Sequence, residues 1–192
     1  MRRTAFGSSI IAVLLTSCGR SPSTESLLPG KDPSLMTILI ESTAFQGGET
    51  IPKLYTCDGK DVSPPLAWSG VSEAARSLAL ICEDPDAPRG TWTHWVIFDI
   101  PASVKELGEG TPAQERVKVT AGGETALQGK NDFGKTGYGG PCPPSGSHRY
   151  FFRIYALDTG LGLGPGTTRV DLLRSIKGHV LAEGELMGRY SR

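Results

Sequence analysis

The sequence has no excess of positive or of negative charge. The 20 Lys and Arg residues balance 20 Asp and Glu residues, which gives a formal net charge of +0 and an isoelectric point of about 6.8. Without a basic surplus, no overall field draws the protein to nucleic acid or to an acidic surface. We therefore do not expect nucleic acid as a partner.

The sequence also lacks the short motifs that mark common enzyme classes. It has no His-Glu zinc motif and no glycine-rich phosphate loop, and SGSH at 145–148 is not a nucleophile elbow. Cys142 is near His148 in sequence, but the surrounding PCPPSG does not begin a helix that would lower the pKa of the thiol. We therefore expect no catalysis, no cofactor and no metal.

Long apolar runs are missing as well, and the run from Ile10 to Leu15 is too short to span a membrane as a helix. Two arginines precede this run, and small residues lead from it to Cys18 in LTSC. The order is typical of an export signal, and LTSC resembles the bacterial lipobox, whose cysteine receives diacylglycerol and becomes the new N-terminus. The alternative is a plain secretory signal with an accidental cysteine.

We expect residues 1–17 to be a lipoprotein signal peptide and Cys18 to anchor an exported protein to a bacterial membrane. Gly19, rather than Asp, after the cysteine favours the outer membrane if the host has one. Residues 18–36 are polar, contain proline and have no hydrophobic period, which is typical of a flexible tether. Residues 37–192 are then a single folded domain, and a hydrophobic fraction of 38% suits a domain with a core.

The folded part is predicted to be mainly β, because 25 glycines and 14 prolines separate short apolar runs. SLALICE at 77–83 and HWVIFDI at 94–100 are apolar on both faces and predict central strands. The stretch HRYFFRIYALD alternates from His148 onward and predicts another strand. The segment LQGKNDFGKTGYGGPCPPSGS at 127–147 is long and rich in glycine and proline. It is expected to be a loop that forms one wall of a site.

One segment alone has the period of a helix. In TTRVDLLRSIKGH, either Thr167 or Thr168 can cap the start, and Val170, Leu173 and Ile176 recur at helical spacing. A second short turn through HVLAEGE and a last strand LMGRYS are expected to follow.

Acidic and imidazole side chains gather at the predicted strand ends. Asp84 and Asp86 flank a proline directly after one strand. His94 opens the next strand, and His148 opens a third with Tyr150 on the same face. Two imidazoles, a hydroxyl and the N–H groups of a glycine-rich loop offer several donors to an anion, so a zwitterion such as phosphoethanolamine fits this inventory. The alternatives are an Asx turn at the aspartates and histidines that only edge the core.

Three stretches then carry a family resemblance. DPDAPRGTWTHWVIFDIP, GYGGPCPPSGSHRYFFRIYALD and GHVLAEGELMGRY resemble the phosphatidylethanolamine-binding protein family, in its bacterial branch usually called Raf-kinase-inhibitor-like. The resemblance runs from about residue 37 onward. It implies a central antiparallel sheet packed on a smaller sheet in a Greek-key-like order, short C-terminal helices, and one small anion pocket at the ends of the central strands. Carried over by motif, the pocket residues are Asp84, His94, Gly140, Pro141, His148 and Tyr150, with Asp86 and Tyr138 as neighbours.

The expected function is therefore that of a non-catalytic binding protein. The resemblance implies a phosphate-type anion or a phospholipid head group as ligand, with regulation of a partner enzyme as a further role. The identity of that partner does not transfer from the eukaryotic members, because a fold is inherited more safely than a function. The alternatives are inhibition of serine proteases, known for some relatives, and a hydrolase that uses the His and Asp side chains.

Cysteine usage gives one more expectation. With Cys18 lipidated, Cys57, Cys82 and Cys142 remain, so at most one bridge can form. Cys82 lies within an apolar strand and is expected to be a buried thiol. Cys57 and Cys142 lie in turn-rich loops and are the expected pair, provided that their Cα atoms come within about 7 Å.

Overall fold

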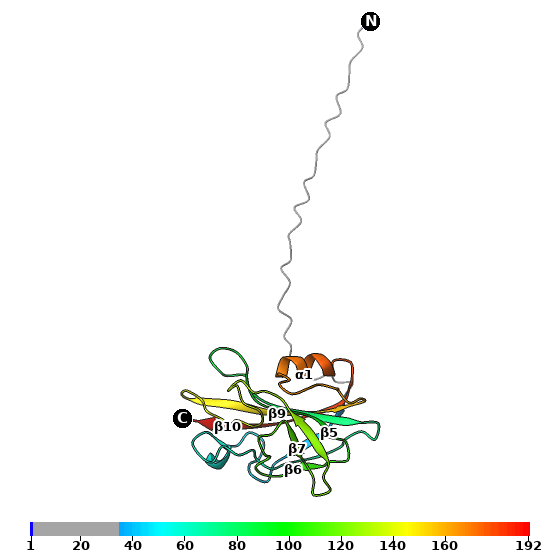
Figure 1. Cartoon of the computed structure of the whole chain (residues 1–192). Helices are drawn as coiled ribbons and strands as arrows, with labels where there is room; N and C mark the ends of the chain where they lie inside the picture. The colour runs from blue at the N-terminus through cyan, green and yellow to red at the C-terminus, as the bar shows by residue number, and fades with distance from the viewer. Residues whose placement is uncertain (2–34) are drawn as a thin grey trace.

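The computed structural model describes residue 1 and residues 35–192. Apart from Met1, the predicted signal peptide lies outside the described residues, as do Cys18, the predicted lipidation site, and all but residues 35 and 36 of the predicted tether. Two β-sheets and one α-helix make up the described part (Figure 1). The helix lies on one side of the larger sheet, and the smaller sheet packs on the other side.

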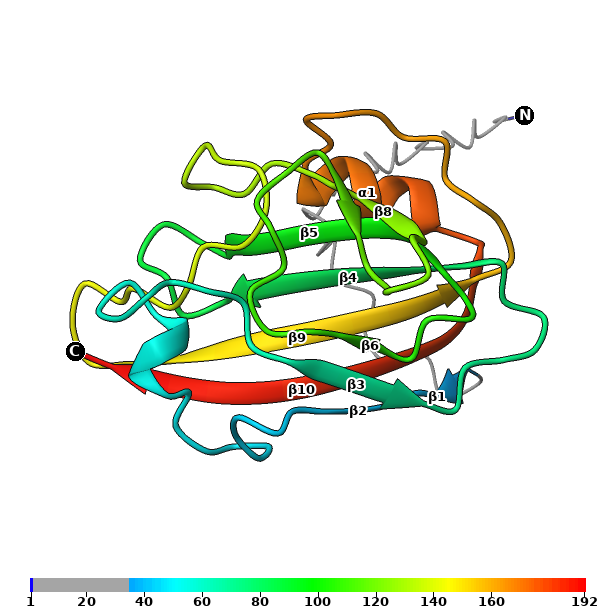
Figure 2. The same ribbon diagram turned by 60° about the horizontal axis from the view of Figure 1, so that its bottom comes forward.

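Seven strands form the larger sheet. In spatial order they are β1 (Met36–Thr37), β10 (Val180–Ser191), β9 (Ser147–Leu157), β4 (Ser77–Asp84), β5 (Trp92–Pro101), β8 (Thr125–Gln128) and β7 (Arg116–Lys118). Neighbouring strands are antiparallel except β1 and β10, which are parallel. Figure 2 shows the four long strands β10, β9, β4 and β5 side by side. The prediction of a mainly β fold with a central antiparallel sheet is confirmed.

The smaller sheet has three short strands, in the order β2 (Leu39–Glu41), β3 (Leu66–Ser69) and β6 (Glu106–Leu107). Trp68 of β3 fills the space between the sheets, and its Nε1 donates to the carbonyl of Val104 over 2.9 Å. Trp95 and Phe152 of the larger sheet belong to the same buried cluster. This cluster is the main core. A 3-10 turn, η1 (Lys53–Tyr55), follows β2 in the chain.

Strand β4 explains why the central runs are apolar on both faces. All eight of its residues are buried. Successive side chains of a strand point to opposite faces, so Leu80 and Cys82 pack in the core between the sheets, whereas Ala79 and Ile81 pack in a second cluster with the helix. A central strand covered on both sides therefore has no polar alternation until its last residues.

The helix α1 (Arg169–Ile176) begins at a capping box. Thr168 is the N-cap, and its hydroxyl oxygen accepts from the amide of Asp171 while the Asp171 carboxylate accepts from the amide of Thr168. Thr168 is therefore the cap, and Thr167 is not. No helix in residues 35–192 is long and apolar enough to cross a membrane.

Two sequence predictions near the helix are wrong in detail. Val170 is 37% exposed, because Leu172 takes the inward position beside Leu173 and Ile176. The segment HVLAEGE forms no second turn, because nearly all of it belongs to β10, which pairs with β9 along its whole length. The described residues therefore contain one short α-helix rather than several.

Candidate functional site

The ends of three neighbouring strands, β9, β4 and β5, lie together at one end of the larger sheet. Asp84, the last residue of β4, pairs with Trp92 at the start of β5, and Glu83 pairs with Phe151 of β9, three residues after His148. Strand β4 stops there because Pro85 has no N–H for the ladder. The polar side chains that the sequence placed at three strand ends are therefore neighbours in space.

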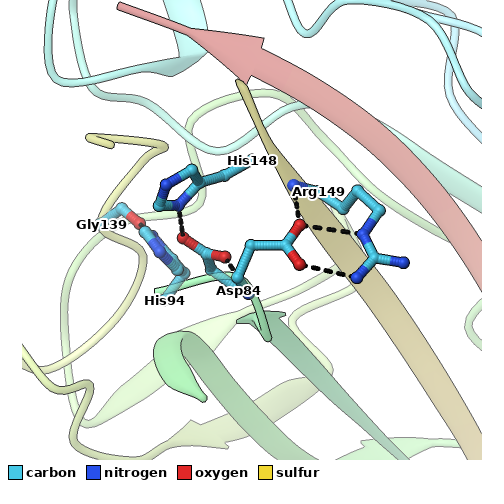
Figure 3. A network of polar contacts seen from close by, with 6 residues as sticks. Asp84, His94, Gly139, His148 and Arg149 are labelled. Carbon is cyan, nitrogen blue, oxygen red and sulfur yellow. Dashed lines mark hydrogen bonds and ion pairs between the residues drawn. The ribbon is translucent and has the colours of Figure 1, made fainter. Parts of the chain in front are cut away.

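The carboxylate of Asp84 is buried, with 3% of the residue exposed, and both of its oxygens are engaged. Oδ1 accepts from the amide of Asp86 over 2.8 Å, so the Asx turn considered as an alternative does form. Oδ2 accepts from Nδ1 of His148 over 2.7 Å (Figure 3). One carboxylate thus fixes both the turn after β4 and the orientation of an imidazole from β9.

His94 is fixed in a different way. It is 2% exposed, and its Nδ1 lies 2.7 Å from the carbonyl oxygen of Gly139 (Figure 3). A carbonyl oxygen only accepts, so Nδ1 carries the hydrogen. The amide of Gly139 donates back to the carbonyl of His94 over 2.9 Å, which ties the glycine-rich loop to β5. In the neutral ring the second nitrogen, Nε2, therefore keeps its lone pair.

These two imidazoles face one cavity of about 310 Å³. Its lining residues are Asp84, Ala87, Pro88, Arg89, Trp92, His94, Phe133, Cys142, Pro144 and His148. No hydrogen bond reaches Nε2 of either histidine from the described residues. The cavity therefore offers two unpartnered imidazole nitrogens beside a buried carboxylate.

Three of the predicted site residues line this cavity, namely Asp84, His94 and His148. Sequence reasoning named none of the other lining residues as a site residue, although it expected the loop that carries Phe133, Cys142 and Pro144 to form one wall of a site. Arg89 and Trp92 lie inside the DPDAPRGTW stretch already singled out, so their position in that stretch was a usable signal. Phe133 lies in the glycine-rich loop expected to form one wall of the site, but no local pattern distinguishes Phe133 from the other residues of that loop.

Aromatic rings form one wall. Phe133 meets the rings of Trp92 and His94 edge to face, with ring centroids 5.5 and 5.3 Å apart. The Phe133 side chain is on the surface, since the residue is 41% exposed. Arg89 is also exposed and makes no ion pair with any described residue. The mouth of the cavity is thus apolar on one side and carries a free cation.

Tyr150 lies behind the cavity rather than along it. Its ring meets His94 edge to face at 5.2 Å, and the residue is fully buried. Burial, and then the charge of Asp84, raises the pKa of its hydroxyl well above the usual range. The backbone amide of Cys142 opposes that rise, but its geometry falls short of a hydrogen bond, so the hydroxyl has no partner among the described residues.

Asp86 does not line the cavity, and its carboxylate is bound by Arg149 instead. Its Oδ2 accepts from both the amide and Nε of Arg149 over 2.9 Å, and its Oδ1 accepts from Nη2 over 2.6 Å. These bonds lower the pKa of Asp86 to about 2. The second aspartate therefore braces the start of β9 rather than meeting a ligand.

The other predicted residues support the loop from behind. The hydroxyl of Tyr138 donates to the carbonyl of Tyr55 over 2.8 Å, and the carbonyl of Pro141 accepts from the amide of Cys57 over 3.1 Å. Gly140 has no room for a side chain, since an added Cβ would stand 2.3 Å from the carbonyl oxygen of Tyr55. None of Tyr138, Gly140 and Pro141 lines the cavity.

Burial governs the protonation of His94. It lowers the pKa of the ring below the ordinary value of 6.5, whereas the carbonyl of Gly139 and the charge of Asp84 act in the opposite direction. The charge of Asp84 does act to raise the pKa of this histidine, but desolvation is the larger effect and the net change is downward. His94 is neutral at pH 7.

Two cysteines join the loop to the segment around η1. The Sγ atoms of Cys57 and Cys142 lie 2.10 Å apart as a disulfide, with a Cα–Cα distance of 5.5 Å. Cys82 is a buried thiol, and burial raises its pKa well above 9.0. Among the described residues, no three His, Cys, Asp or Glu side chains are grouped so that they could hold a metal ion.

The chain is similar in sequence to a known protein family. Residues 41–191 match the phosphatidylethanolamine-binding protein family. A UPF0098 protein of Methanothermobacter thermautotrophicus is 53% identical over 80% of this chain and 98% of its own length, and one of Aquifex aeolicus is 50% identical over 79% and 86%.

Two solved structures are also similar. A phosphatidylethanolamine-binding protein homologue of Chlamydia trachomatis has a TM-score of 0.73 at 41% identity, and Escherichia coli YbcL has 0.73 at 32%. Each comparison covers 81% of this chain and 98% of the other. The residues that match the family, 41–191, include the strands β5 and β9 with His94 and His148. The chain therefore belongs to the phosphatidylethanolamine-binding protein family.

Proposed function

We propose that the cavity binds a phosphate-type anion, such as a phospholipid head group, and that the protein acts through binding rather than catalysis. The observation that carries this proposal is the paired use of the two histidines. Nδ1 of His94 is hydrogen-bonded to the carbonyl of Gly139, and Nδ1 of His148 is hydrogen-bonded to the carboxylate of Asp84. Nε2 of each ring has no partner among the described residues. Two fixed rings in one small cavity are preorganised for a ligand.

Phosphate chemistry matches these two nitrogens. A protonated imidazole donates to a phosphate oxygen and adds charge, whereas a neutral one accepts from a P–OH group or from an ammonium group. His94 is neutral at pH 7, so its Nε2 suits a protonated oxygen or the amine of an ethanolamine head group. Binding a full anion draws protons onto the rings, and affinity therefore rises as the pH falls.

The mouth of the cavity favours a head group that carries apolar parts. Arg89 supplies a cation for the anion, and Phe133 and Trp92 supply apolar surface next to it. The description of the family as phosphatidylethanolamine-binding supports the same class of ligand. A phospholipid and a free phosphomonoester share this chemistry. Regulation of a partner enzyme through the occupied site remains part of the proposal.

Hydrolysis has less support from the cavity. Its lining contains no serine or threonine, and the only sulfur there, that of Cys142, belongs to a disulfide. Asp84 already accepts two hydrogen bonds from the protein. None of these groups is a free nucleophile with an adjacent base.

Titration calorimetry with phosphoethanolamine and with inorganic phosphate tests the proposal. His94→Ala and His148→Ala should each lose about 1.5–3 kcal/mol of binding free energy, the range for a hydrogen bond to a charged group. His179→Ala is the matched control, because that histidine is exposed and pairs with Asp158 away from the cavity. Affinity should be higher at about pH 5 than at about pH 8, on either side of the ordinary histidine pKa.

Equal affinity in all four proteins would overturn the anion site. Release of product from a phosphoester by the wild type, lost in His94→Ala and His148→Ala, would favour the hydrolase instead. Inhibition of a serine protease without any anion binding would favour the inhibitor.

A further inference from the structure

The disulfide is part of the cavity wall. Cys142 lines the cavity, and its partner Cys57 stands at the end of the segment that follows β2, 85 positions away in sequence. Both cysteines are partly exposed, so a thiol reagent can reach them. The bond therefore joins the wall of the cavity to the segment around η1.

The loop on the cavity side of this bond also positions His94. Gly139 holds Nδ1 of the ring, and the next residue, Gly140, donates its amide to Oδ1 of Asp61 over 2.6 Å. Asp61 has a φ of 57°, a left-handed conformation that non-glycine residues rarely adopt. The residues just before Cys142 are thus held by a strained neighbour as well as by the covalent bond.

A guanidinium group stands beside the sulfur of Cys142. Nη1 of Arg192 lies 3.6 Å from Cys142 Sγ, and Nη2 lies 2.9 Å from Oδ1 of Asp58. Two backbone hydrogen bonds with Gly146, of 3.0 and 3.2 Å, fix Arg192 to the same loop. A neighbouring arginine lowers the pKa of a thiol and stabilises its thiolate. Nothing comparable is bonded to the sulfur of Cys57 among the described residues.

From these contacts we infer that the Cys57–Cys142 disulfide is a redox switch that sets the affinity of the cavity for its anion. The oxidised protein is the binding form. Reduction by a dithiol weakens binding while the domain stays folded. This inference rests on the proposed anion site and names how that site is regulated.

The exchange has a defined direction. One thiolate of the dithiol attacks Sγ of Cys57, the S–S bond breaks, and Cys142 leaves as a thiolate beside Arg192. The second thiolate of the dithiol then attacks the mixed disulfide and releases Cys57. The protein disulfide gains two electrons, and the dithiol becomes a disulfide. A leaving thiolate stabilised by a cation leaves faster, so Arg192 promotes the first step.

Reduction acts on the cavity in two ways that reinforce each other. The Cys142 thiolate places a negative charge in the wall that faces the anion. The loop that holds Gly139 against His94 also loses its covalent tie to the segment around η1. Repulsion between like charges a few ångströms apart near a protein surface is large enough to lower the affinity about tenfold.

The test compares one protein in two redox states. The full chain is titrated with inorganic phosphate and with phosphoethanolamine, before and after treatment with dithiothreitol, which is uncharged and does not compete for an anion site. The state of Cys57 and Cys142 is verified by thiol labelling and peptide mass spectrometry, and folding by near-ultraviolet circular dichroism. We expect an affinity at least about tenfold lower after reduction. A Cys57→Ser/Cys142→Ser double variant should not respond to dithiothreitol.

The outcomes separate the two proposals. Tight binding that is equal in both redox states overturns the switch and leaves the anion site standing. Absence of binding in the oxidised protein overturns the anion site, and the switch with it. Loss of the folded dichroism spectrum on reduction also overturns the switch, because a switch requires a folded reduced form.

A second measurement needs no ligand. Arg192→Gln should slow the reduction by dithiothreitol at least about threefold, because the Cys142 thiolate loses its neighbouring cation. Arg174→Gln is the matched control, since Arg174 is an exposed arginine of α1. Equal reduction rates in Arg192→Gln and Arg174→Gln would overturn the assignment of Cys142 as the leaving thiolate.

Discussion

His148 donates its Nδ1 hydrogen to Oδ2 of Asp84 across 2.7 Å, although 64 positions separate the two residues in sequence. A second pair of the same kind exists on the surface, where Nδ1 of His179 lies 2.8 Å from Oδ1 of Asp158. The two pairs differ in burial. The side chains of His148 and Asp84 are 10% and 5% exposed, whereas those of His179 and Asp158 are 46% and 47% exposed. The chain thus contains its own comparison of a buried and an exposed pair.

Removing the buried carboxylate should destabilise the fold much more than removing the exposed one. Asp84→Ala leaves the buried Nδ1 of His148 and the partly buried amide of Asp86 without acceptors, at about 1–3 kcal/mol for a buried donor. Asp158→Ala should cost less than about 1 kcal/mol, as is usual for exposed pairs. Urea unfolding of both variants at neutral pH measures the difference. Equal losses would show that burial does not decide the strength of these pairs.

His94 should make the protein sensitive to mild acid. Its pKa in the folded state is lowered by burial, so the unfolded state binds the proton more readily. The stability from this group is therefore fully present above about pH 6.5 and is lost as the pH falls below that value, at about 1.4 kcal/mol per pH unit for one proton.

The measurement is the free energy of unfolding between about pH 7.5 and about pH 5, in wild type and in His94→Gln. The variant should lose less stability on acidification than the wild type, whereas His179→Gln should behave like the wild type. Identical slopes for all three proteins would contradict the burial of a neutral ring at position 94. Added phosphate should offset part of the acid loss, since it favours the protonated ring.

Much of the fold could be predicted from sequence because a buried strand shows as a short run of apolar residues. The run at 77–83 is apolar on both faces, and it became a strand covered by the smaller sheet on one side and by α1 on the other. Asp84 and His94 could be predicted because a strand end is a local event. Val170 could not, because the inward side of a short helix is set by what it packs against.

The aromatic wall of the cavity was out of reach for the same kind of reason. Phe133 reaches the cavity because buried Asn131 orders its loop, with Oδ1 accepting from the amides of Phe133 and Lys135. The sequence predicts that this loop forms one wall of the site, but it does not single out Phe133. Asp86 illustrates the converse, since it does not line the cavity and its partner Arg149 lies 63 positions away. Such pairings depend on strand register, which no short motif records.

The lipid anchor remains a proposal on residues outside the described part. Cys18→Ala should release the protein from the membrane fraction or block its maturation, because LTSC supplies the only proposed acylation site. Fractionation of cells, followed by mass spectrometry of the mature N-terminus, measures both effects. A Ser17→Ala variant is the control, since it keeps the cysteine. If Cys18→Ala still fractionates with membranes and is processed at the same bond, the lipoprotein assignment is wrong.

A last prediction concerns Glu83, which precedes Asp84 and points to the opposite face of the sheet. The residue is 1% exposed, and its carboxylate binds two arginines, Arg153 over 2.7 Å and Arg169 at the start of α1. Glu83→Gln leaves these partly buried cations without their shared anion, so it should cost about 3–5 kcal/mol of stability. Glu185→Gln is the control, because Glu185 also binds Arg153 but is exposed, and its loss should cost less than about 1 kcal/mol.

Urea unfolding gives both values, and calorimetry on the folded Glu83→Gln protein should return the wild-type affinity for phosphoethanolamine. A small loss of stability would show that the two arginines keep their positions without the carboxylate, and a loss of affinity in the folded variant would show that the helix side of the sheet communicates with the cavity.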